Sequence, residues 1–428
     1  SWSQRHGASP NLLDWSTTGS GSGGQAWYDL TIAVSPQNKN VVLTGGVNIW
    51  RSNNGGSSFS LSGHWYGGGG VSFVHADHHC LIFRPGSNEL YAGCDGGVYK
   101  SSNGGVNNSW VSRNQGLAIT QYYKIGTTDS DPSLTIAGAQ DNGTHLNDNG
   151  WNKVGGGDGM DCAIDKLNPN IMYRSIYYGD FDKSTNGGNN FNASFNLPPS
   201  GSGNWVTPFI ASRISSNTLY AGFDKLWKST NGGFSFSATT SNSIFNSNNI
   251  DVLAEAPGDP NVIYAGINNR LYYSSNGGSS WTWISSNIGS GNVITGITVD
   301  PLNSDHVYIS KSSYISNAKV YESFNAGGSW YNRSSSLPNI PINCIAYQKN
   351  SNGLVYVGTD IGIYFRDASM NSWIPFNEGI PNTIVNDIEI LMSEGIIRVG
   401  TYGRGVWESP LASVFLTKPK SDFIAIPE

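Results

Sequence analysis

The chain has 428 residues, of which only 13% are charged, and it carries 54 glycines, 14 tryptophans and a formal net charge of −6. Negative net charge argues against a nucleic-acid partner, and no apolar run approaches the roughly 18 residues that cross a bilayer as a transmembrane segment. A glycine-rich, charge-poor chain is typical of an all-β array with many tight turns.

Four predicted strands recur along the chain. Residues 1–26 carry no clear repeat and are expected to be a leader or part of a preceding sheet, whereas 27–417 form the repeat array and 418–428 a tail or linker. In each repeat the first strand is apolar and often ends at an Asp-Pro or similar turn, and the second reads like Val-Tyr-Ala-Gly. The nine first strands are expected to begin near Tyr28, His78, Gln121, Met160, Trp205, Asn249, Asn292, Ile342 and Thr383.

The third strand of six repeats leads into Ser-x-Asn-x-Gly, followed by an aromatic residue. An asparagine side chain can bond the backbone of its own turn, and glycine accepts the positive φ that such turns need. We therefore predict that each motif closes the hairpin between the third and fourth strands, and call these motifs staple turns. Their asparagines, predicted to be structural, are Asn54, Asn103, Asn186, Asn231, Asn276 and Asn325.

The spacing of the staple turns predicts the fold. Their serines lie 49, 83, 45, 45 and 49 residues apart, and the 83-residue step spans two repeats with a degenerate copy at 147–151. A period in the forties with strand-like flanks indicates a β-propeller. Nine sheets exceed the usual four to eight of one ring. The array is therefore either one large ring or shared between two rings, with earlier blades before Ser1.

Connection geometry selects the face that should carry function. In an up-and-down sheet of four strands, the first and third connections lie on one face. The second connection and the link to the next sheet lie on the other. The staple turns occupy the first of these faces, so we expect a ligand site on the opposite face.

Polar residues gather in the loops of that opposite face. The loop entering the second repeat contains His75, Asp77, His78 and His79, and the next connection on this face begins at Asp95. The following two repeats add Asp141, Asp158 and Asp161.

Three interpretations of these loops stay open. Aspartate beside glycine is ordinary turn chemistry. Histidine with carboxylate would suit a transition metal such as zinc, and aspartate with backbone carbonyls would suit calcium; the predicted metal ligands are His75, Asp77, His78 and His79. Paired carboxylates could instead cleave a glycosidic bond. The catalytic candidates are Asp77, Asp141, Asp158 and Asp161.

Aromatic residues supply further candidates. Trp65 and Tyr66 precede a run of four glycines and are predicted to lie exposed in a ligand-binding loop, together with His75, His78, His79 and Asp95. The pairs at 122–123 and 177–178 could also stack on sugars. Packing between sheets is the alternative for these two pairs.

Two of the four cysteines flank a turn. Cys80 and Cys94 each lie seven residues from Ser87, which predicts that they face each other on paired strands. A disulfide between them would imply an oxidising compartment. Cys162 and Cys344 sit in apolar strands and are predicted to be buried thiols.

The staple turn resembles the Asp-box of bacterial neuraminidase repeats, with asparagine in place of aspartate. The stretches 77–79, 95–97, 140–143 and 156–159 resemble secreted bacterial propeller proteins of the sortilin-like and xyloglucanase-like superfamily. Many Bacteroidetes members carry a C-terminal sorting domain for type IX secretion, and members typically have further blades upstream.

This resemblance implies a secreted or cell-surface protein. It would bind a glycan or protein ligand as an adhesion or scaffold module, and a missing C-terminal domain could engage the outer-membrane secretion or attachment machinery. The alternative is a glycoside hydrolase acting on a polysaccharide. The catalytic aspartate pair of true xyloglucanases matches no positions here, so none is carried over.

Overall fold

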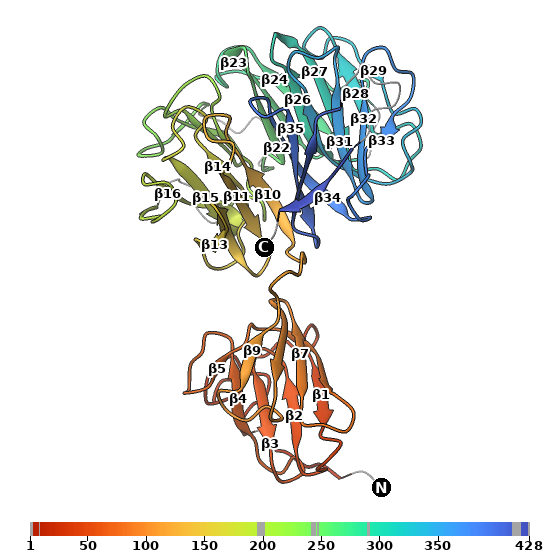
Figure 1. Ribbon diagram of the computed structural model, residues 1–428. Coiled ribbons are helices and arrows are strands. Elements are labelled where there is room, and N and C mark those ends of the chain that lie inside the picture. The colour runs from red at the N-terminus through yellow and green to blue at the C-terminus, as the bar shows by residue number, and fades with distance from the viewer. Residues whose placement is uncertain are drawn as a thin grey trace. The chain divides into compact units, whose positions relative to one another are not determined.

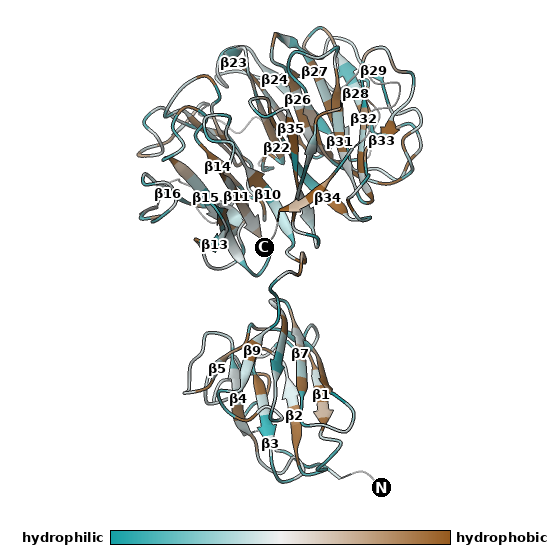
Figure 2. Ribbon diagram, in the orientation of Figure 1, coloured by the Kyte–Doolittle hydropathy of each residue, from teal (hydrophilic) through white to brown (hydrophobic). Residues whose placement is uncertain are grey.

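The computed structural model describes residues 3–7, 9–194, 202–240, 245, 248–288, 292–412 and 421–426. These residues form nine antiparallel sheets in two compact units, unit 1 (residues 1–117) and unit 2 (residues 118–428) (Figure 1). Hydrophobic residues recur along the strands of both units (Figure 2). The described residues contain no helix long and apolar enough to cross a membrane.

Unit 1 contains two of the sheets. The first consists of β1 (Thr31–Val34), β2 (Val42–Gly45), β3 (Ile49–Ser52) and β4 (Ser60–His64), with β5 (Ser72–Phe73) added parallel to β4. The second consists of β6 (His78–Phe83), β7 (Leu90–Cys94), β8 (Gly97–Ser101) and β9 (Trp110–Ser112).

Unit 2 contains the other seven sheets, each built from four consecutive strands. The third sheet is β10 (Tyr122–Gly126), β11 (Thr135–Ala139), β12 (Gly143–Asn147) and β13 (Trp151–Lys153). The fourth is β14 (Cys162–Ile164), β15 (Met172–Ile176), β16 (Asp180–Ser184) and β17 (Ala193–Ser194), with the short 3-10 helix η1 (Tyr177–Gly179). The fifth is β18 (Phe209–Ala211), β19 (Leu219–Gly222), β20 (Leu226–Ser229) and β21 (Ser237–Ala238).

The remaining four sheets follow the same order. The sixth is β22 (Val252–Ala256), β23 (Asp259–Ile267), β24 (Arg270–Ser274) and β25 (Thr282–Trp283). The seventh is β26 (Ile294–Asp300), β27 (Asn303–Lys311), β28 (Val320–Ser323) and β29 (Tyr331–Asn332). The eighth is β30 (Ile342–Tyr347), β31 (Val355–Thr359), β32 (Gly362–Arg366) and β33 (Ile374–Pro375). The ninth is β34 (Ile384–Leu391), β35 (Ile396–Tyr402), β36 (Val406–Pro410) and β37 (Ile424–Ile426).

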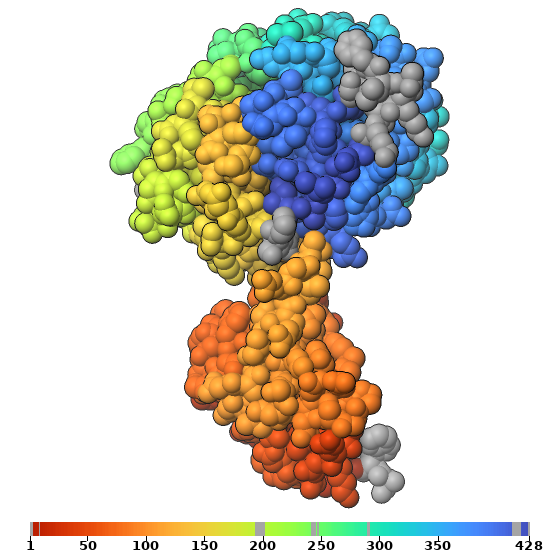
Figure 3. All heavy atoms as spheres, in the orientation of Figure 1, coloured from red at the N-terminus to blue at the C-terminus, as the bar shows by residue number. Residues whose placement is uncertain are grey.

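The seven sheets of unit 2 close into a ring. Their first strands contact one another in chain order, from β10 to β34, and β34 then contacts β10. At this junction the Ile125 amide donates to the Asp387 carboxylate at 3.0 Å, and the Asn386 amide donates to the Tyr122 carbonyl at 3.0 Å. The first and last sheets of unit 2, coloured orange to yellow and blue, lie side by side at the surface in Figure 3. The predicted array shared between two rings therefore corresponds to a closed seven-sheet ring and a separate two-sheet unit.

One position of each first strand packs against the preceding sheet. It pairs with the residue that directly precedes a glycine or serine in the second strand, as Leu253 pairs with Ala265 and Ile297 with Ile309. In eight sheets this side chain is at most 9% exposed and joins a cluster that includes residues of the preceding sheet. We call it the inter-sheet position; these eight residues are Leu81, Ile125, Cys162, Phe209, Leu253, Ile297, Ile345 and Ile388.

A hydrogen bond reinforces some of these contacts. The side chain of the residue just before the inter-sheet position can accept a hydrogen bond. The donor is the backbone amide of the inter-sheet residue in the next sheet. Asp161 accepts in this way from Phe209, at 3.0 Å, and Asp387 from Ile125. In unit 1 the Thr31 hydroxyl accepts from the Leu81 amide at 3.2 Å. These hydrogen bonds join one sheet to the next, and we call each of them a clasp.

The staple turns have the predicted bond from asparagine to backbone: in the turn at Ser229, Asn231 Oδ1 accepts from the Ser235 amide at 3.0 Å. The Ser229 hydroxyl donates to the Asn231 side chain at 2.9 Å and accepts from the Gly233 amide at 2.9 Å. Gly233 has a φ of 89°. The serine-to-asparagine bond recurs in the other five turns at 2.9–3.0 Å. Each turn joins the third and fourth strands of its sheet.

The chain ends differ from expectation. The described residues before Thr31 contain no strand. They instead pack beside the first sheet, where the Asn48 amide donates to the Asp14 carbonyl at 3.0 Å. Ile424–Ile426, assigned to a tail, form the fourth strand of the last sheet because they pair with β36. The sequence pattern missed this strand, which follows no staple turn.

The predicted pairing of Cys80 with Cys94 is wrong, because the strand register differs from the expected one. A bulge in β6 pairs Cys80 with Gly93 and leaves Cys94 opposite His78. Both cysteines are free thiols in the structure. Cys162 and Cys344 are buried thiols, as predicted.

Candidate functional site

The first strands of unit 2 surround a central channel of about 810 Å³. All seven sheets contribute to its wall. The residue preceding the inter-sheet position lines it in every sheet of the ring. These seven residues are Lys124, Asp161, Pro208, Val252, Gly296, Cys344 and Asp387.

Three charged residues are adjacent on this wall. Lys124 Nζ lies 3.4 Å from Asp387 Oδ1, and Asp161 accepts from the Cys162 and Phe209 amides at 2.8 and 3.0 Å. Burial raises the pKa of Asp161 to about 7, although the Lys124 ammonium opposes the shift. The pKa of Asp387 is also raised by burial, with Lys124 again opposing. Both carboxylates are therefore engaged in clasps between sheets and share one lysine.

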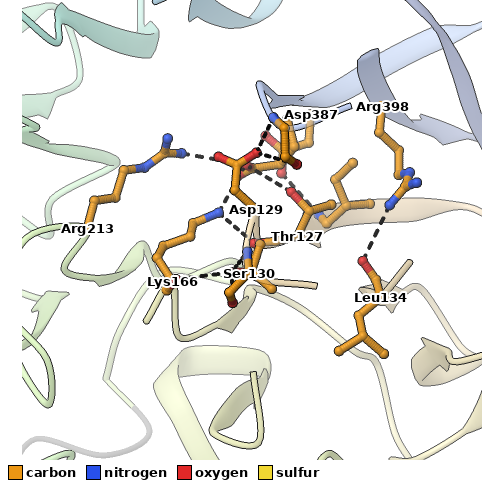
Figure 4. A network of polar contacts seen from close by, with 12 residues as sticks. Thr127, Asp129, Ser130, Leu134, Lys166, Arg213, Asp387 and Arg398 are labelled. Atoms are coloured by element: carbon orange, nitrogen blue, oxygen red, sulfur yellow. Dashed lines mark hydrogen bonds and ion pairs between the residues drawn. The ribbon is translucent and has the colours of Figure 1, made fainter. Parts of the chain in front are cut away.

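A second charged network occupies the staple-turn end of the channel (Figure 4). Glu389 Oε2 lies 3.3 Å from Lys166 Nζ and 3.5 Å from Arg213 Nη2. Lys166 also donates to the Thr127 carbonyl at 2.6 Å. Burial would raise the pKa of Glu389, but the two cations outweigh burial and lower it. One carboxylate and two cations meet here, and with the Thr127 carbonyl their contacts join four sheets.

The opposite mouth of the channel carries exposed aromatic side chains. Tyr177 and Trp205 stack with ring centroids 5.5 Å apart and an interplanar angle of 13°, and Tyr178 meets Trp205 edge-on at 5.4 Å. These side chains are 39%, 40% and 44% exposed for Tyr177, Trp205 and Tyr178. Trp205 directly precedes Val206, which lines the channel. We call these three residues the aromatic platform.

Backbone and polar contacts hold the platform. Tyr178 has a φ of 63°, a conformation that bulky residues rarely adopt. Its amide donates to the Trp205 carbonyl at 3.4 Å, and its carbonyl accepts from the Gly203 amide at 3.1 Å. Strained backbone of this kind is concentrated at functional sites.

The platform continues into the rim of the channel. Trp205 Nε1 donates to the Tyr123 hydroxyl at 3.1 Å, which donates to Gln140 Oε1 at 2.7 Å. Tyr402 donates to the same amide oxygen. Tyr123 and Tyr402 also line the channel, so the aromatic platform, rim and channel form one continuous surface.

Sequence reasoning found only part of this site. The tyrosine pairs at 122–123 and 177–178 were identified as stacking candidates, and the structure buries Tyr122 while leaving Tyr177 and Tyr178 exposed. The sequence pattern predicts Trp205 only as the start of a strand. It lies on a link between sheets, on the face without staple turns, and that position is the signal that could have identified it.

The predicted aspartates of unit 2 lie in two places. The Asp141 amide donates to Asp158 Oδ1 at 2.7 Å, so these two loops are held together. Asp161 lies on the channel wall, in a clasp. Asp77 belongs to unit 1, whereas Asp141 and Asp158 belong to unit 2. Each unit alone therefore contains only part of the predicted aspartate group.

The histidine-rich loop of unit 1 makes several separate contacts. His79 Nε2 lies 2.7 Å from Asp95 Oδ1, and Gln25 donates to Asp77 Oδ1 at 2.5 Å. Burial, reinforced by the charges of Asp29 and Asp95, raises the pKa of Asp77 to about 7.

The neighbouring His78 is buried, with Nδ1 2.7 Å from the Gly46 carbonyl oxygen. Burial lowers its pKa to about 4. The ring therefore stays neutral near pH 7, as part of the core.

The predicted metal site does not form among these residues. Within the described part of each unit taken alone, no three histidine, cysteine, aspartate or glutamate ligand atoms lie within 4.8 Å of one another. His75, Asp77, His78 and His79 are therefore not assembled as ligands. Gln25, Gly46 and Asp95 instead contact three of them directly.

Trp65 and Tyr66 are exposed, as predicted. They meet edge-to-face at 4.8 Å, and Trp65 Nε1 donates to the Trp15 carbonyl at 3.1 Å. They lie in unit 1, on the loop after β4.

Comparison with solved structures places the fold. YCF48 bound to D1 peptide aligns over 70% of this chain and 96% of that chain, with a TM-score of 0.52 and 12% identity. The fold is a β-propeller. The Niastella koreensis GH74 enzyme aligns over 93% of this chain and 76% of that chain, with a TM-score of 0.40 and 14% identity. No family model and no curated protein matches the chain.

In the propeller of unit 2, the two mouths of the channel differ in chemistry. The mouth on the staple-turn face carries the charged network of Lys166, Arg213 and Glu389. The mouth on the other face carries the aromatic platform. Concave surfaces that combine aromatic side chains with a few polar groups are typical of ligand sites. The platform mouth is therefore the candidate site.

Proposed function

We propose that the protein is a secreted or cell-surface binding module whose seven-sheet propeller holds a glycan at the channel mouth opposite the staple turns. The observation that carries this proposal is the exposed aromatic platform of Tyr177, Tyr178 and Trp205. Aromatic rings offer large, rigid contact area, and a sugar ring presents an apolar face that can lie against them.

The surroundings of the platform suit a glycan. Hydroxyl groups need hydrogen-bonding partners close to the stacking surface, and Tyr123, Gln140 and Tyr402 lie on the adjoining rim. Tyr177 and Trp205 stack on each other, which fixes the orientation of both rings and reduces the conformational entropy lost on binding.

The carboxylates of the channel favour binding over hydrolysis. A glycoside hydrolase of the usual kind needs two carboxyl groups about 5 to 9.5 Å apart beside the glycosidic bond. Asp161 and Asp387 each accept a backbone amide from the neighbouring sheet and share Lys124, which gives them a structural role. Hydrolysis of a polysaccharide remains a distinct outcome of the test below.

The test is the substitution Trp205→Ala, measured by affinity electrophoresis against a panel of soluble polysaccharides. Loss of one stacking partner worth about 1.4 kcal/mol weakens binding about tenfold. Two matched controls are available. Trp283→Ala removes an exposed tryptophan from the outer strand β25, and Asn231→Ala disrupts a staple turn on the other face. We expect both controls to bind as the wild type does.

Three results would contradict the proposal. Equal losses of polysaccharide affinity in Trp205→Ala and Trp283→Ala would show that the platform is not the binding site. Release of reducing ends from any polysaccharide would make the protein an enzyme. YCF48 was solved with a D1 peptide, and capture of peptides but of no polysaccharide by this chain would replace the glycan with a protein ligand.

A further inference from the structure

Unit 1 has its own group of exposed aromatic side chains. Trp65 and Tyr66 follow β4 and are 42% and 60% exposed, and their rings meet edge-to-face. Trp15, on the segment before β1, is 53% exposed. The hydrogen bond from Trp65 Nε1 to the Trp15 carbonyl joins the two segments. We call these three residues the Trp65 cluster.

Two fully buried side chains fix the segments that carry this cluster. The Asn48 side chain donates to the Asp14 carbonyl at 3.0 Å and accepts from the Trp65 amide at 3.3 Å. On His64, Nδ1 accepts from the amide that follows Trp65 at 3.4 Å, and Nε2 lies 3.2 Å from the Trp15 carbonyl oxygen. A neutral imidazole with its proton on Nε2 makes both bonds. Buried polar groups are costly to leave unpaired, so these bonds hold the two segments together.

The glycine run after Tyr66 shapes the loop around that ring. A side-chain carbon at Gly68 would lie 2.5 Å from Tyr66 Cε2, which is too close for any side chain. The other three glycines of the run have φ of 70–74°, a conformation that glycine adopts readily. The run therefore leaves room for the Tyr66 ring and places it at the surface.

Hydroxyl groups follow directly after the first aromatic residue of the cluster. The Ser16 hydroxyl, next to Trp15, lies 3.5 Å from that of Thr18, which lies 2.8 Å from that of Ser20. Thr18 and Ser20 are exposed. The Asp14 side chain is buried and accepts from the Ser16 hydroxyl at 2.5 Å. This segment therefore exposes hydroxyl groups and no charge.

We propose that Trp15, Trp65 and Tyr66 form a second glycan site, on unit 1, whose ligand is a neutral polysaccharide. Sugar rings stack on exposed aromatic faces, and sugar hydroxyls bond to neighbouring polar groups. The stretches 14–20 and 65–70 contain a single charged residue, the buried aspartate, so the surface offers no partner for an acidic sugar. This site is additional to the one at the channel mouth of unit 2 and does not depend on it.

The test is affinity electrophoresis of the full chain carrying Trp205→Ala, which weakens the channel mouth. The neutral probes are hydroxyethylcellulose, galactomannan, arabinoxylan and soluble starch, and the acidic probes are alginate and polygalacturonate. We expect a neutral polysaccharide to retard this variant, and added Trp65→Ala to weaken that binding about tenfold. The matched control adds Trp27→Ala instead, because Trp27 is an 87% exposed tryptophan of unit 1 outside the cluster. We expect this control to leave binding unchanged.

Gly68→Ala provides a second test that keeps every aromatic side chain. The φ of Gly68 lies outside the left-handed region, so alanine leaves the backbone unstrained. Its added methyl group would displace the Tyr66 ring, and we expect weaker binding of the same neutral polysaccharide. Unchanged thermal unfolding shows that each variant folds.

Three results would overturn the proposal. One is the absence of retardation of Trp205→Ala by every neutral probe. Another is an equal effect of Trp65→Ala and Trp27→Ala in that background. The third is retardation by the acidic probes alone, which would give the site a charged ligand. A Trp205→Ala chain that binds as tightly as the wild type would contradict the channel-mouth site and leave the unit 1 site to account for binding.

Discussion

His306 shows how neighbouring carboxylates can stabilise a charged side chain inside this fold. Its Nδ1 lies 3.1 Å from Asp300 Oδ2, its Nε2 lies 2.9 Å from Glu322 Oε1, and Phe324 stacks on the ring at 4.5 Å. Burial alone would lower the pKa of His306. The hydrogen bonds and charges of Glu322 and Asp300 outweigh burial and raise it. Two carboxylates therefore favour the protonated imidazole.

This raised pKa predicts a pH-dependent contribution to stability. A histidine whose folded pKa exceeds its unfolded value of about 6.5 stabilises fully below that value, and the contribution is lost as pH rises through the folded pKa. His306→Gln should cost about 1.5–3 kcal/mol at pH 5.5 and about 1 kcal/mol at pH 8.5. Denaturant unfolding of wild type and variant at both pH values measures the difference. An equal cost at the two pH values would show that the pKa of His306 is the same in the folded and unfolded states.

Residues differ in how far sequence can reveal their role. Asn231 was identified correctly because its partners, Ser229 and Ser235, lie within four positions of it. His306 on β27 meets carboxylates from two other strands, Asp300 on β26 and Glu322 on β28, so no local pattern predicted the network. Asp161 is a catalytic candidate in the sequence because it is a carboxylate. Its hydrogen bond to the Phe209 amide depends on a neighbouring sheet, which the sequence pattern does not show.

At the scale of the strand, one position carries much of the contact between sheets. Ile297 is buried at the inter-sheet position of the seventh sheet, whereas Ile32 occupies the same position with 67% exposure. The two side chains are identical and occupy the same register. A difference in the effect of truncating them therefore reports burial and not strand preference.

We predict different costs for the same substitution. Ile297→Ala should destabilise by about 2–4 kcal/mol, because it leaves a cavity between two sheets. Ile32→Ala should change stability by less than about 0.5 kcal/mol. Chemical denaturation of the two variants tests this. A similar loss for both would mean that strand preference, and not packing, sets the energy of this position.

Sequence predicted the strands better than their connections. All nine first strands begin within four residues of the expected starts, because apolar residues and turn motifs repeat along the chain. The bulge that shifts Cys80 away from Cys94 leaves no trace in composition. Strand β37 was missed because its pairing with β36 crosses a longer connection without a staple turn.

At the scale of the molecule, the chain divides into two units with separate cores. The cluster around Leu43 belongs to unit 1, and each of the nine hydrophobic clusters of described residues lies within a single unit. Domains with their own cores can unfold independently.

Differential scanning calorimetry should therefore resolve two transitions. Ile297→Ala is expected to lower the melting temperature of only one, and Leu43→Ala, which truncates a fully buried residue of unit 1, only the other. A single transition that both substitutions shift equally would show that the two units unfold together.

Closure of the ring has a consequence for biosynthesis. The amide of Ile125 finds its acceptor on Asp387, in the last sheet of unit 2 to leave the ribosome. Until that segment emerges, the growing polypeptide has an uncovered apolar edge at β10, and such edges invite aggregation in partly synthesised proteins. The propeller of unit 2 can therefore reach its native state only after translation has delivered its final strands, and the cell must shield the nascent chain during that interval.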